Sequence, residues 1–61
     1  MQIAEQLDFY AEEYLALATE PGISIRRAKA LMGISRSWTI LAEQLRRLAH
    51  IEEKENERRA A

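Results

Sequence analysis

The sequence predicts an all-α fold, with one helical domain over residues 1–61 built from three helices. Three observations lead to this prediction. Apolar residues recur at steps of three and four through most of the chain, as they do along one face of an α-helix. The pattern breaks at Pro21, Gly22 and Gly33, and these residue types are typical of turns. No stretch alternates apolar and polar residues in the way that a half-buried strand would.

The first helix is predicted over residues 2–19, approximately. Its apolar stripe is broad, roughly 160° of the helix circumference at 100° per residue, and consists of Ile3, Leu7, Tyr10, Tyr14 and Leu17 with alanines beside them. A helix with so wide an apolar face is expected to contact two neighbouring helices. Pro21 and Gly22 end this helix, because proline disfavours the helical conformation in the residue before it and glycine readily adopts a turn.

Two further helices are predicted, over residues 25–32 and residues 36–57. Ser24 and Ser35 are suitable N-caps, and Gly33 between them is suited to a left-handed C-terminal cap. Trp38, with the leucines that follow it at helical spacing, forms the core face of the third helix. An alternative makes Gly33 a kink in one long helix over 25–57. The chain is then a helical hairpin with little core, which must dimerise into a four-helix bundle.

The size and composition exclude several classes of protein. A chain of 61 residues without cysteine has no disulfide to stabilise it, and an isolated domain this small is marginally stable. We therefore expect a homodimer. No apolar run approaches the roughly 18 residues of a membrane span, and acids stand near the N-terminus where a signal peptide carries bases. We expect a cytoplasmic protein that is not an enzyme and has no catalytic residues, metal site or cofactor.

The net charge of −1 conceals a strong segregation of charge along the chain. Residues 1–20 carry five acids and no base, whereas residues 24–48 carry six bases and a single acid. Residues 49–61 carry four acids and three bases. Segments of opposite sign are more informative than the total, because each defines a surface with its own class of partner.

Residues 24–37 carry the functional signal. They resemble the helix-turn-helix of small bacterial regulators and phage excisionase-like proteins, although Lys29 and Thr39 depart from the usual pattern. Glycine makes the turn in that motif, and the following serine starts the recognition helix. The residues that match it in order are Ile25, Ala28, Leu31, Met32, Gly33, Ile34, Ser35 and Arg36.

The resemblance implies a regulatory protein that binds DNA through its third helix. Arg36 is then placed to contact guanine, Gln44 to contact adenine, and Ile40 to touch a thymine methyl group. The residues expected at the DNA on this interpretation are Arg26, Arg27, Arg36, Ser37, Ile40, Gln44 and Arg47, the arginines near the phosphates included.

A second interpretation is association between proteins. Phe9, Ile40 and Ile51 are large apolar residues that do not fit the predicted intramolecular core, so they indicate a contact surface. The chain is then an interaction module without nucleic-acid binding. It acts as an adaptor or antagonist of a larger regulator, or as a four-helix-bundle homodimer.

Overall fold

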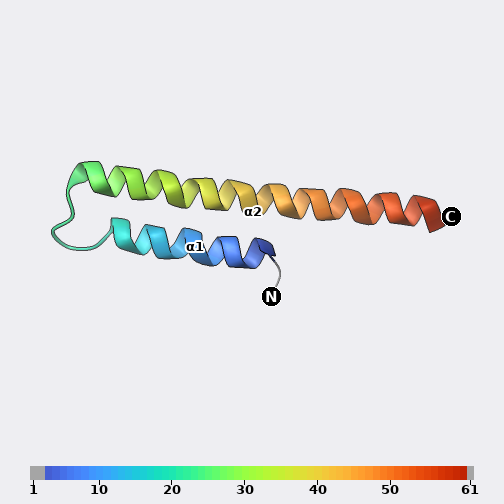
Figure 1. Cartoon of the computed structure of the whole chain (residues 1–61), viewed down its shortest axis with the longest axis horizontal. Helices are drawn as coiled ribbons and strands as arrows, with labels where there is room; N and C mark the ends of the chain where they lie inside the picture. Colours follow the sequence, from blue (N-terminus) through green and yellow to red (C-terminus); the bar gives the residue numbers. More distant parts are fainter. Residues whose placement is uncertain (1–2, 61) are drawn as a thin grey trace.

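The computed structural model describes residues 3–60, which form two α-helices. Helix α1 spans Ile3–Ala18 and helix α2 spans Ile25–Ala60. They run antiparallel side by side, and the C-terminal part of α2 projects past the start of α1 (Figure 1). The prediction of an all-α chain is confirmed, and the first helix ends within a residue of its predicted end. Its predicted start at residue 2 lies outside the described residues. Over residues 3–60, neither helix is both long and apolar enough to cross a membrane.

The connection between the helices follows the local sequence signals. The Thr19 hydroxyl donates to the Ala16 carbonyl at 3.0 Å, which satisfies one of the free carbonyls at the end of α1. The amide of Ile23 then donates to the Glu20 carbonyl at 3.4 Å, closing a turn in which Gly22 has a φ of 82°. Proline followed by a glycine of positive φ is the arrangement of a type II turn. The predicted break at Pro21 and Gly22 is thus confirmed.

Ser24 caps the N-terminus of α2, as predicted. Its Oγ accepts a hydrogen bond from the amide of Arg27 at 3.2 Å, and its carbonyl accepts from the amide of Ala28 at 2.9 Å. The first of these is the bond that an N-cap serine makes to the third residue of a helix. The cap therefore sets where α2 begins.

The prediction of three helices is wrong, because α2 continues through Gly33. Gly33 does not have a positive φ, and the segments expected at 25–32 and 36–57 are one helix. Ser35 is not an N-cap either: it is buried, and its hydroxyl donates to the Ala11 carbonyl of α1 at 2.6 Å. The continuous helix gives no support to a helix-turn-helix-like pair of helices, since that motif depends on a turn here.

The physical reason for the continuous helix lies in a repeat of small residues. Ala4, Ala11 and Ala18 of α1 are all buried and lie seven residues apart. On α2, small residues also recur at every seventh position, at Ala28, Ser35, Ala42 and Ala49. A spacing of seven keeps residues on one side of an uninterrupted helix. A turn at Gly33 would take Ala28 out of line with Ser35 and Ala42, and part of the contact with α1 would be lost.

The hydrophobic core that results is small. It consists of Ala4, Leu7 and Ala42, with Trp38 and Leu45 packed against it, and no large side chain in residues 3–60 is fully buried. The accessible surface is 5325 Å², whereas a compact monomer of this mass exposes about 4,100 Å². The radius of gyration is 16.2 Å, against about 10–11 Å for a compact chain of this length. The hairpin therefore leaves an unusually large surface uncovered.

Replacing Gly33 by alanine should stabilise the protein, by about 0.5–1 kcal/mol, because alanine is the better residue inside a helix. The Cβ added at Gly33 meets nothing within 4 Å, so the space is free. Urea denaturation followed by circular dichroism measures the change. Destabilisation by a similar amount would contradict the continuous helix and would favour a left-handed glycine at this position.

Candidate functional site

One side of the hairpin carries a second repeat of seven, made of large apolar residues. We call this surface the apolar face. Each of its six side chains is between 42% and 67% exposed, although a side chain of this kind is normally buried. The apolar face consists of Ile3, Tyr10 and Leu17 from α1, and of Ile34, Leu41 and Leu48 from α2.

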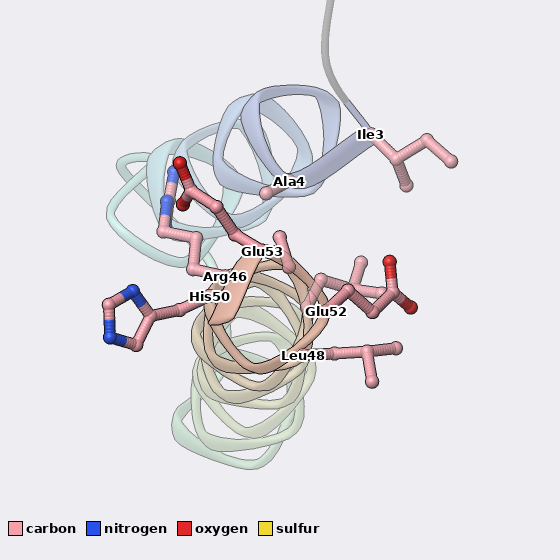
Figure 2. A pocket seen from close by; sticks show the side chains of 9 residues that line it. Ile3, Ala4, Arg46, Leu48, His50, Glu52 and Glu53 are labelled. Atoms are coloured by element: carbon pink, nitrogen blue, oxygen red, sulfur yellow. The ribbon is translucent and has the colours of Figure 1, made fainter. Parts of the chain in front are cut away.

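The two helices present these residues on the same side. Viewed along the helices, Ile3 of α1 and Leu48 of α2 point to one side of the hairpin, whereas His50 points to the other (Figure 2). The remaining members follow at intervals of seven from Ile3 and from Leu48, so they continue the two rows along that side. The apolar face therefore runs over both helices for most of the length of α1.

Trp38 lies at the base of the apolar face, between the two helices. Its ring is tilted against that of Tyr10, with centroids 5.3 Å apart. Its indole Nε1–H is buried and has no hydrogen-bond partner among residues 3–60. An unpaired buried N–H lowers the stability of the fold, so Trp38 stabilises the hairpin through the packing of its large ring. The expectation that Trp38 anchors the core is consistent with this placement.

The opposite side of the hairpin is polar and holds an ion pair between the helices. Arg46 of α2 donates from its guanidinium to the carboxylate of Asp8 of α1. The hydrogen bond to Asp8 raises the pKa of Arg46, with smaller contributions from the charges of Asp8, Glu5 and Glu43, while partial desolvation opposes the rise. Both side chains are largely exposed, so the pair contributes little to stability and chiefly marks the polar side.

An open groove of about 690 Å³ lies at the end of the hairpin where α1 begins. Its floor is apolar, from Ala4, Leu45 and Ala49, and Ile3 and Leu48 continue it into the apolar face. Acidic Glu52 and Glu53 also line the groove, and Glu52 points to the same side as Leu48 (Figure 2). The groove exists because α2 continues past α1, which leaves the last apolar residues of the seam between the helices without cover.

The seven residues predicted to contact DNA are all exposed on α2. By the helical period, Arg36, Ile40 and Arg47 lie on the side that points away from α1, with Arg26 and Gln44 beside them. Arg27 falls on a different side of the helix. The hydroxyl of Ser37 donates back to the Gly33 carbonyl at 3.0 Å.

The residues predicted as an interface are not brought together within one chain. Phe9, Ile40 and Ile51 are each about half exposed, at 53%, 47% and 46%. Phe9 lies on the outer side of α1, whereas Ile40 and Ile51 lie on the outer side of α2. None of the three belongs to the apolar face. The sequence signal that could have identified the apolar face is a pair of seven-residue repeats on each helix. Small residues repeat on the side that faces the other helix, and large apolar residues repeat on the adjacent side.

Comparison of the chain with protein-family models, with curated proteins and with solved structures finds no match. The fold and the site together define a class in physical terms: an antiparallel helical hairpin whose apolar face is left uncovered by the described residues 3–60.

Proposed function

We propose that this protein is a helical interaction module that self-associates through its apolar face, forming a four-helix bundle from two hairpins. The observation that carries the proposal is the second apolar repeat on each helix, exposed on the same side of the hairpin. In a four-helix bundle each helix packs against two neighbours, so it needs two apolar rows. The row of small residues and the buried Leu7 pack between the two helices of one hairpin. The apolar face would pack against the second hairpin.

The uncovered area supports a second copy as the partner. The chain exposes about 1,200 Å² more than a compact monomer of its mass, and a stable protein interface buries about 800 Å² on each partner. A flat face made of two parallel rows is also self-complementary under a two-fold axis. Pairing two apolar faces therefore supplies the core that one hairpin lacks.

Two hairpins can pair their apolar faces with the two-fold axis either parallel or perpendicular to the helices, and the charges favour the parallel axis. With the two-fold axis parallel to the helices, α1 of one copy lies against α2 of the other. Residues 1–20 carry only acids and residues 24–48 carry mostly bases, so this arrangement brings opposite charges together. With the axis perpendicular to the helices, α1 packs on α1, and like charges then face each other at a cost.

Sedimentation velocity over a range of concentrations tests the proposal, with Leu41→Glu as the disrupting variant. Leu41 is in the apolar face and is 42% exposed. A glutamate there should abolish the dimer, because burying an unpaired carboxylate is strongly unfavourable. Ile40→Glu is the matched control, since Ile40 is the next residue, is 47% exposed and lies outside the face.

We expect the wild-type chain and Ile40→Glu to sediment as dimers at micromolar concentration and Leu41→Glu to sediment as a monomer. Circular dichroism of each variant checks that the helices remain. A wild-type chain that stays monomeric at several hundred micromolar would refute self-association. Equal losses in the two variants would place the interface elsewhere on the helix.

A further inference from the structure

We propose that the outer edge of α2 binds the phosphate backbone of nucleic acid, an activity separate from self-association. Six cations share this surface, which we call the basic edge: Arg26, Lys29, Arg36, Arg47, Lys54 and Arg58. At 100° per residue they fall within roughly 80° of the helix circumference. All six are exposed.

The hairpin separates its charges onto opposite edges. The outer side of α1 carries Glu5, Glu12 and Glu13, and no base lies in α1. The acids of α2 nearest to the basic edge, Glu43 and Glu55, fall at its margins. Arg46 is held by Asp8 on the polar side and does not join it. The basic edge thus faces outward with the acids of α1 behind it, and a net charge of −1 does not prevent a locally positive field.

The shape of the basic edge favours a groove over a flat surface. The edge follows a single straight helix, and Arg26 and Arg58 are about 48 Å apart at 1.5 Å per residue. An α-helix is narrow enough to enter the major groove of DNA, with phosphates on both sides, and the basic edge lies on the side of α2 that points away from α1. Four of the six cations are arginines, whose planar guanidinium binds phosphate oxygens in pairs. A flat membrane surface would meet only the crest of this convex edge.

The basic edge stays accessible when two hairpins pair. It lies about a quarter of a turn around α2 from the apolar face, as judged from the helical period. Binding to nucleic acid is therefore expected of the single hairpin. In the proposed dimer the acidic α1 of the second copy lies beside α2, so we expect the dimer to bind more weakly than the single hairpin. Because the edge contacts phosphates, we expect binding without strong preference for sequence.

The test measures fluorescence anisotropy of a labelled duplex of mixed sequence, about 30 base pairs long, titrated with the full chain at several salt concentrations. We expect binding at about 50 mM salt that weakens steeply as salt is added. The slope of log affinity against log salt concentration should be about −3.6 to −5.4 for four to six neutralised phosphates. The double variant Arg36→Glu with Arg47→Glu should bind about tenfold or more weakly, with a slope smaller by about two. Arg36→Gln with Arg47→Gln should show the same trend more mildly.

The control compares two single charge reversals: Arg59→Glu, at an exposed position off the basic edge, and Arg47→Glu, on the edge. The Arg59→Glu variant is the one expected to keep its affinity. It should bind nearly as well as the wild-type chain. Three results would overturn the proposal: no binding at about 50 mM salt, where phosphate contacts are strongest; equal losses of affinity in Arg59→Glu and Arg47→Glu; or binding to vesicles of anionic phospholipid without binding to the duplex. The last result would assign the edge to a membrane surface. Sedimentation of the same variants keeps this outcome separate from a failure of self-association.

Discussion

Replacing Ala42 by leucine is expected to unfold the hairpin. Ala42 is 0% exposed and packs in one cluster with Ala4 and Leu7, between the two helices. Three added carbons have no space there, and overpacking costs about 1–3 kcal/mol even in larger cores. A core in a chain this short supplies no more than about 3–5 kcal/mol, so the loss consumes most of the stability.

Thermal denaturation followed by circular dichroism measures this effect as the loss of a cooperative transition. Ala49→Leu is the matched control. Ala49 stands one repeat further along α2, is exposed, and borders the open groove where α1 begins. A leucine there should leave the melting temperature unchanged or slightly raised. If both variants melted like the wild-type chain, the close approach of the helices at Ala42 would be wrong.

The second large effect is expected at Trp38, where two substitutions should differ sharply. Trp38→Ala removes the ring that packs on Tyr10 and on the core, and should destabilise the chain by about 2–3 kcal/mol, below the full range for a completely buried tryptophan. Trp38→Phe keeps an aromatic ring and removes an N–H that has no partner in the part of the chain that the structure describes. Because an unsatisfied buried donor is itself unfavourable, we expect this variant to stay within about 1 kcal/mol of the wild-type chain.

Urea denaturation at matched protein concentration distinguishes the two outcomes, since the stability of a self-associating chain depends on concentration. A Trp38→Phe variant as unstable as Trp38→Ala would show that the indole N–H makes a necessary hydrogen bond. In the proposed dimer, such a bond would run to a group of the second copy.

Local sequence signals were sufficient for the first half of the fold. The step of the apolar residues in α1, the Pro21–Gly22 turn and the Ser24 cap each depend on residues within a few positions, so reading them required no knowledge of the rest of the chain. The same reasoning was wrong at Gly33 and Ser35. Glycine and serine are compatible with a turn and also with a helix interior, and the local preferences differ by only about 1 kcal/mol.

The predicted sites also divide into those that local sequence signals could place and those that depend on the packing of the two helices. The outward placement of Arg36, Ile40 and Arg47 could be derived from the helical period alone, and the helix places them so. The apolar face could not be identified in the same way, because it depends on which sides of two different helices point in the same direction. The repeats of seven were visible in the sequence, but their relation to each other depends on how α1 lies on α2.

The sequence by itself determined that the chain is helical, where α1 ends and the turn follows, and that its charges divide between an acidic and a basic segment. Only the tertiary structure decided that residues 25–60 form one helix and that an apolar face remains uncovered. The reason is physical. A continuous α2 lines up Ala28, Ser35 and Ala42 against the alanines of α1, and that packing outweighs the small local cost of a glycine within a helix.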